Sequence, residues 1–259
     1  MVTRVHGGVL AAVAVCCLTG ATVQSGEAWP LRLGRPRTTV VGIGDSVTSG
    51  AHCGCATFIR RYADQVARQH HESVRSIDLG QPGATSAGLL AAIQPGGRDV
   101  VPLADATVVV LTIGANDFAN HPARLEDDQC GGSDGLACTI PVLARVTDNV
   151  AAIIARIRRL HRGHPVTIKV TGYWNIFEDG AVARADYPDW FRRAADVLTR
   201  RLNAVLRRIA QHRGAEYVDL YTPFKGPNGT DDDTDLLEPD GDHPNSAGHA
   251  LIARTLTQH

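Results

Sequence analysis

The chain has 259 residues, of which 44% are hydrophobic, 20% charged and 5% aromatic, and its 26 basic and 27 acidic residues give a formal net charge of -1. This composition excludes a disordered chain, which combines low hydrophobicity with high net charge, and a strongly basic nucleic-acid-binding protein. The length suits a soluble globular protein with a single α/β domain.

The N-terminal segment has the features of a secretory signal peptide. Arg4 supplies a positive charge, residues 9–18 form an uninterrupted apolar run, and small residues at Gly26 and Ala28 fit a cleavage site. The run is shorter than the about 20 apolar residues of a membrane-spanning helix, so we expect no stable membrane insertion. We assign residues 1–28 to the signal peptide, 29–37 to a linker and 38–259 to one secreted domain.

Strand-like and helix-like segments alternate along the rest of the chain. Apolar or β-branched runs predict strands at 38–43, 75–79, 106–113, 166–171 and 216–221. Amphipathic spacing and helix start and stop signals predict helices at 58–70, 87–93, 141–161, 190–212 and 246–256. Five strands separated by helices form repeated βαβ units. We therefore expect an open, mostly parallel sheet with helices on both faces.

Four cysteines follow the predicted signal peptide: Cys53, Cys55, Cys130 and Cys138. In a secreted protein an even number of cysteines indicates disulfides. We favour a bond between Cys130 and Cys138, which would close a glycine-rich loop. A bond between Cys53 and Cys55 would form a small, strained ring, so their pairing stays open. The cysteine spacing does not match the usual zinc motifs, and we expect structural disulfides and no metal site.

Polar segments follow the predicted strands, at the sheet edge where α/β proteins bind their ligands. Ser46 follows the first strand, and its hydroxyl becomes a nucleophile if a base takes its proton. His243, in a loop after the fifth strand, can be that base, and Asp240, three residues earlier, can orient its ring. These three residues predict a catalytic triad.

A triad that attacks an ester also needs donors to the negative oxygen that develops. The candidates are the backbone N–H groups of Ser46 and Gly83 and the side-chain amide of Asn116, which follow the first, second and third predicted strands. Taken alone, Ser46 could cap a helix and the other two could serve turns. Because all of these residues fall at matching strand ends, we favour the catalytic interpretation.

Four segments, GDSVTSG, PGATS, GAND and DGDHPNSAGH, resemble in their order and separation the motifs of the SGNH hydrolases, also called the GDSL esterase/lipase family. The resemblance extends from Val40 to the last predicted helix, with Val47 at a position where the family name has Leu. It implies a flavodoxin-like three-layer α/β/α sandwich with a five-stranded parallel sheet, no cofactor or metal requirement, and hydrolysis of carboxylic esters through an acyl-enzyme.

The roles that this resemblance implies are the ones expected from the residues themselves. Ser46 is the nucleophile, His243 the general base and Asp240 the third triad member, while Ser46, Gly83 and Asn116 form the oxyanion hole. We therefore expect a secreted, monomeric esterase or lipase that acts on a small-molecule or lipid ester and binds no nucleic acid. Two alternatives use the same cleft: an acyltransferase that excludes water, and a catalytically silent module that binds a glycan or lipid.

Overall fold

A computed structural model of the protein describes residues 38–258, which belong to the compact unit Arg35–His259. The predicted signal peptide and linker lie outside the described residues. The described part is built around one five-stranded, all-parallel sheet, in the order β2-β1-β3-β4-β5. Its strands are β1 (Thr38–Gly44), β2 (Val74–Gly80), β3 (Val108–Thr112), β4 (Thr167–Thr171) and β5 (Glu216–Val218).

The strand order reverses at β1, which lies between β2 and β3. Gly44 at the end of β1 is in register with Gly80 of β2 and with Thr112 of β3. Three strands therefore end level with one another, and the loops that follow them begin at one edge of the sheet. Ligands of open parallel sheets bind beyond such an edge, at the reversal in strand order.

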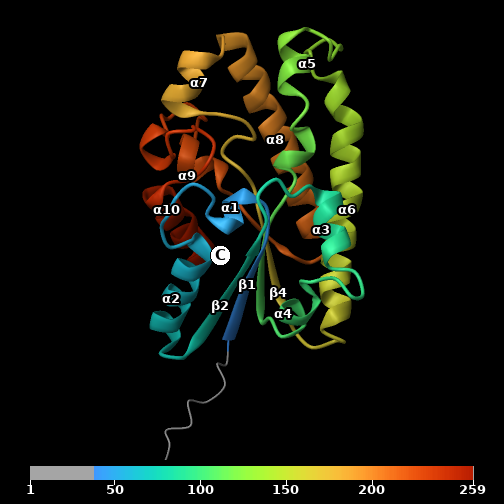
Figure 1. Ribbon diagram of the computed structural model, residues 1–259, viewed down its shortest axis with the longest axis vertical. Coiled ribbons are helices and arrows are strands. Elements are labelled where there is room, and N and C mark those ends of the chain that lie inside the picture. The colour runs from blue at the N-terminus through green and yellow to red at the C-terminus, as the bar shows by residue number, and fades with distance from the viewer. Residues whose placement is uncertain (1–37, 259) are drawn as a thin grey trace, which may run out of the picture. The chain divides into compact units, whose positions relative to one another are not determined.

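Helices cover both faces of the sheet, as the alternating sequence pattern predicts (Figure 1). Helices α2 (Phe58–His70) and α10 (Ser246–Thr257) contact each other on one face. On the other face α6 (Ile140–Leu160) packs between α3 (Ser86–Ala92) and α8 (Asp189–His212). The predicted α/β class and three-layer arrangement are confirmed.

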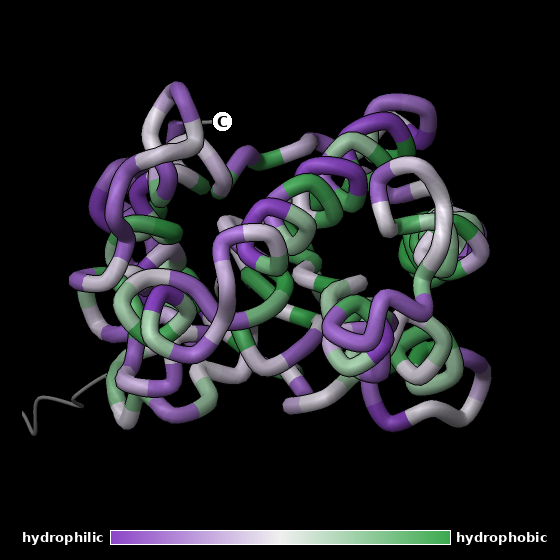
Figure 2. Tube along the Cα trace, turned by 90° about the horizontal axis from the view of Figure 1, so that it is seen from above, coloured by the Kyte–Doolittle hydropathy of each residue, from purple (hydrophilic) through white to green (hydrophobic). Residues whose placement is uncertain are grey.

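The core lies between these layers. The central strands are buried on both faces, with Val40, Val41, Val109 and Val110 fully inaccessible to solvent, which is why their sequence is continuously apolar rather than alternating. The helices are amphipathic instead, and Figure 2 shows hydrophobic and hydrophilic residues alternating along them.

Helix α6, with the turn before it, has the length and apolar composition of a membrane span over Ala137–Leu160. The core helix of a globular domain passes the same test. In the fold, one side of α6 belongs to the hydrophobic core: Val142, Val146, Val150, Ile153, Ile154 and Ile157 are all buried. We therefore interpret α6 as a core helix.

The structure differs from the sequence-based elements mainly in short segments. Strand β5 ends at Val218, three residues before the predicted end, because the Asp219 carboxylate accepts the Tyr221 N–H at 3.1 Å and turns the chain into a short helix. The short helices that were not predicted are α1 (Ser46–Ser49), α4 (Val100–Ala104), α5 (Pro122–Glu126), α7 (Gly180–Asp186) and α9 (Tyr221–Lys225). Most have fewer than two turns, too few for a periodic pattern to form.

Candidate active site

Ser46 is the first residue of α1, directly beyond the carboxyl end of β1 (Figure 1). Its side chain is half-buried. Asp45, rather than Ser46, caps the helix, because its carboxylate accepts the Val47 N–H at 3.1 Å. Gly44 has a φ of 141°, and a Cβ there would collide with the Thr112 carbonyl of β3. The capping interpretation of Ser46 is therefore wrong, and its hydroxyl is not occupied by capping.

A buried hydrogen-bond network fixes Asp45 below the serine. Asp45 is 1% exposed, its Oδ1 accepts the Thr112 hydroxyl at 2.9 Å, and its Oδ2 accepts the Tyr173 hydroxyl. Thr112 in turn shares a hydrogen bond of 2.5 Å with the Thr48 hydroxyl of α1. Burial raises the pKa of Asp45, and the hydrogen bonds from Tyr173 and Thr112 oppose that rise. The network joins the turn that carries Ser46 to strand β3 and to the segment that follows β4.

Removing the Tyr173 hydroxyl tests this network. In Tyr173→Phe a buried carboxylate oxygen of Asp45 loses its donor, so we expect the free energy of unfolding to fall by about 1–3 kcal/mol. Urea unfolding measures the change. Tyr187→Phe is the control, since it removes the same atom from a half-buried ring that stacks on Phe191. Equal stability of the Tyr173 variant and the unmodified protein would contradict the role of this hydrogen bond.

Asp240 and His243 form the hydrogen-bonded pair that the sequence predicts. The Nδ1 atom of His243 lies 2.8 Å from Oδ2 of Asp240, and Oδ1 of Asp240 accepts the backbone N–H groups of Asp242 and His243, each at 3.0 Å. Burial acts to raise the pKa of Asp240, but these backbone and ring donors outweigh it, so the pKa lies below its usual value. Asp240 therefore stays ionised and can hold the histidine ring in one orientation.

Asp242, the neighbouring carboxylate, is not placed to orient the ring in this way. Its Oδ2 lies 3.9 Å from His243 Nδ1, beyond hydrogen-bond distance. Burial raises the pKa of Asp242 to about 6, although the charge of His243 acts against this rise. Of these two carboxylates, Asp240 is thus the one within hydrogen-bond distance of His243 Nδ1.

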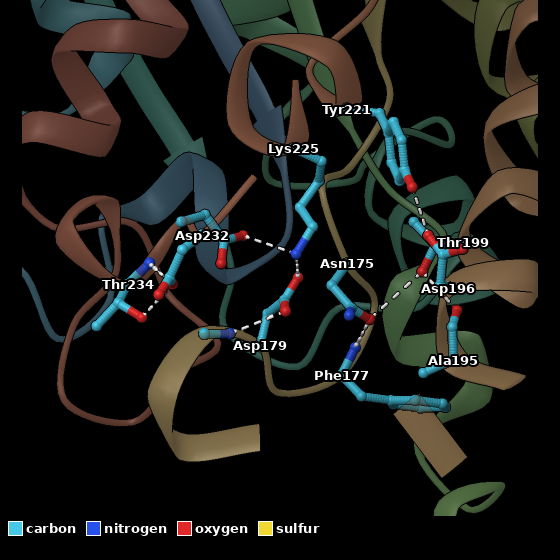
Figure 3. A network of polar contacts seen from close by, with 12 residues as sticks. Asn175, Phe177, Asp179, Ala195, Asp196, Thr199, Tyr221, Lys225, Asp232 and Thr234 are labelled. Carbon is cyan, nitrogen blue, oxygen red and sulfur yellow. Dashed lines mark hydrogen bonds and ion pairs between the residues drawn. The ribbon is translucent and has the colours of Figure 1, made fainter. Parts of the chain in front are cut away.

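A second polar network includes Asp179 and Lys225 (Figure 3) and supports the loop that carries Asp240 and His243. The Asp179 N–H donates to the Gly241 carbonyl at 2.7 Å, and the Asp179 carboxylate accepts Lys225 Nζ at 2.7 Å. Lys225 also lies 3.7 Å from the fully buried carboxylate of Asp233. Gly241 has a φ of 69°, and a Cβ there would lie 2.8 Å from Cβ of Val182. Asp233 belongs to the acid-rich run 231–235, and this run is therefore partly buried rather than wholly exposed to solvent.

The two other predicted oxyanion donors come from adjoining loops. Gly83 has a φ of 74°, a conformation that favours glycine, and a Cβ at this position would have no neighbour within 4 Å. Asn116 lies in the turn η1 (Ala115–Phe118) after β3, and its Nδ2 donates to the Ala84 carbonyl at 3.1 Å. This bond ties the two loops together and uses only one of the two N–H donors of the amide.

Both cysteine pairs form disulfides. Cys130–Cys138 closes the predicted loop. Cys53 and Cys55, whose pairing the sequence left open, are also bonded to each other, with their Cα atoms 5.1 Å apart. Next to this bond lies His249, which is fully buried and accepts the Phe58 N–H on Nδ1 at 3.2 Å. Burial lowers the pKa of His249 to about 4.

Three residues of this region were missed from the sequence. Tyr173 and Thr112 hold Asp45, yet a Tyr and a Thr at strand ends give no distinctive signal. His52 lies in the loop after α1, and its ring centroid is 4.6 Å from that of His243. The available signal for His52 was its position six residues after Ser46, directly before the Cys53-Gly54-Cys55 segment.

The chain is an α/β protein with Ser46 directly beyond β1 and a hydrogen-bonded Asp240–His243 pair after β5, the arrangement expected of a serine hydrolase. The model of the GDSL-like lipase/acylhydrolase family matches residues 43–251. The chain therefore belongs to this family, as its four motifs predict, and the family acts on esters. No match was found among curated protein sequences.

Solved structures share the fold at low sequence identity. The lipase Lip_vut3 from a goat rumen metagenome has a TM-score of 0.66 and 17% identity, with 85% of this chain and 96% of that chain covered. Phospholipase A1 from Streptomyces albidoflavus has a TM-score of 0.61 and 20% identity, with 85% of this chain and 98% of that chain covered. A mutant of Axe2, an acetyl-xylooligosaccharide esterase from Geobacillus, has a TM-score of 0.61 and 18% identity, with 86% of this chain and 94% of that chain covered.

Proposed function

We propose that the protein is a secreted serine esterase or lipase that hydrolyses carboxylic esters through an acyl-enzyme. The observation that carries this proposal is the Asp240–His243 pair, in which the ionised carboxylate accepts the ring N–H at 2.8 Å. With its proton on Nδ1, His243 keeps Nε2 free to accept a proton. The two disulfides support export to an oxidising compartment.

The mechanism begins with proton transfer from Ser46 Oγ to Nε2 of His243. The serine oxygen attacks the ester carbonyl, and the negative oxygen is stabilised by the backbone N–H groups of Ser46 and Gly83 and by the free N–H of the Asn116 amide. Protonated His243 then gives its proton to the leaving alcohol. Water, deprotonated by His243, attacks the acyl-enzyme in the same way and releases the acid.

Covalent labelling of the full chain with a serine-directed phosphonate tests the proposed nucleophile. We expect one equivalent of label, mapped to Ser46 by peptide mass spectrometry, with parallel loss of esterase activity. An unlabelled protein would instead support the silent binding module. A second experiment distinguishes hydrolysis from acyl transfer. The products are analysed in the presence of added alcohol acceptors, because a transferase yields a new ester whereas a hydrolase yields the free acid. A panel of esters with increasing acyl length then identifies the substrate class.

A further inference from the structure

Three potential metal ligands meet at the edge of the candidate active site. The two ring nitrogens and the carboxylate oxygen offered by His52, Asp240 and His243 all lie within 4.8 Å of one another. Both histidines approach the same atom: Oδ2 of Asp240 lies 2.8 Å from Nδ1 of His243 and 3.8 Å from Nδ1 of His52. The catalytic mechanism uses the first of these contacts and gives no role to the second.

Two imidazoles and one carboxylate form a ligand set that zinc prefers. In a tetrahedral zinc site with bonds of about 2.0–2.2 Å, neighbouring ligand atoms lie about 3.3 Å apart. The observed separations of 2.8 and 3.8 Å lie on either side of this value. Shifts of about half an ångström would therefore give both nitrogen–oxygen pairs the spacing of zinc ligands, and the two ring nitrogens lie within 4.8 Å of each other.

The site is also open to solvent on one side and negatively charged. The side chain of His52 is 63% exposed and that of Asp240 is 33% exposed, whereas His243 is 12% exposed. An ion can thus enter over His52 and reach the more enclosed His243. The charge of Asp240 raises the pKa of both Glu178 and Asp242, so two further carboxyl groups lie near the site. A divalent cation would reduce the repulsion among these groups.

We propose that His52, Asp240 and His243 form an inhibitory site for zinc or a similar divalent cation. The inhibitory effect rests on the proposed function, because it acts through the general base. Metal binding to Nδ1 of His243 displaces the proton that this atom shares with Asp240. The neutral ring then carries its proton on Nε2, so it has no lone pair there to accept the Ser46 proton. Zinc is thus an inhibitor and not a cofactor of this enzyme.

The binding test uses the untagged full chain and zinc chloride in isothermal titration calorimetry. We expect one zinc ion per chain. His52→Asn should weaken its binding at least tenfold, because loss of an outer-shell partner alone costs about 10–100-fold. Asn is chosen since His52 has a φ of 67°, which Asn tolerates. His164→Asn, at an exposed histidine elsewhere, should bind zinc as the unmodified protein does. Absence of binding, or equal binding by His52→Asn, would overturn the site.

The inhibition test measures ester hydrolysis against zinc concentration, with each variant compared to its own rate in a chelator. We expect the unmodified protein and His164→Asn to be inhibited at the zinc concentration at which they bind, and His52→Asn only at concentrations at least tenfold higher. An active enzyme that binds zinc at this site without inhibition would overturn the inhibitory role. Calorimetry needs no activity, so a protein that binds zinc through His52 but hydrolyses no ester would contradict the proposed function alone.

Discussion

Replacement of Ser46 by Ala is expected to lower kcat/KM for p-nitrophenyl acetate by about 10³-fold or more, because the nucleophile of a triad has no substitute among its neighbours. Ser46 begins α1, whose N-terminal cap is the Asp45 carboxylate, so loss of the Ser46 hydroxyl leaves the cap intact. The loss should therefore appear in the rate of hydrolysis and not in the urea midpoint. Initial rates and urea unfolding of the same preparation measure the two effects.

Ser49→Ala is the matched control for this variant. Ser49 ends the same short helix, and its hydroxyl donates to the Ser46 carbonyl at 3.0 Å rather than facing a base. We expect Ser49→Ala to keep most of the activity. If the Ser46 variant hydrolysed the ester at the parent rate, the proposed mechanism would be ruled out.

The second large effect is expected for His243→Ala, which should lose activity to about the same extent as Ser46→Ala. The two residues act on the same proton, so the double variant should be no less active than either single variant. Independent roles would instead make the two losses multiply. Rates of the three variants, measured at one pH with the same ester, decide between these outcomes.

His212→Ala is a suitable control for His243, because His212 is an exposed histidine in the last turn of α8. Its activity should equal that of the unmodified protein. Normal turnover by His243→Ala would exclude this histidine as the general base, even if Ser46 proved essential.

The sequence predicted the large elements of the fold because each contains enough residues for a periodic pattern. Helix α2 matches its predicted bounds, 58–70, at both ends, since its apolar positions repeat over three turns. Strand β5 was predicted too long because apolar or aromatic residues continue on both sides of Asp219, up to Tyr221, whereas the Asp219 side chain ends the strand at Val218. A local side-chain hydrogen bond of this kind overrides strand propensity and has no periodic signal.

The hydrogen-bonded Asp240–His243 pair was predictable because its two members lie three residues apart, so the contact is local in the chain. The contacts of Tyr173 and His52 were not, since they join residues separated by 128 positions from Asp45 and by nearly 190 from Asp240. Such contacts depend on which loops the sheet brings together, and a single sequence carries no record of that pairing. Ser46, Gly83 and Asn116 were placed instead by the predicted strand ends, and in the structure they follow β1, β2 and β3.

The two disulfides close very short loops, with sequence separations of 2 and 8 residues. The entropy that a crosslink removes from an unfolded chain increases with loop length, so crosslinks of this kind restrict the unfolded state far less than long-range ones. Neither bond joins two strands or two of the large helices. Folding of the sheet and oxidation of the cysteines are thus separable events. The chain can reach its native topology first, and each cysteine then finds its partner already beside it.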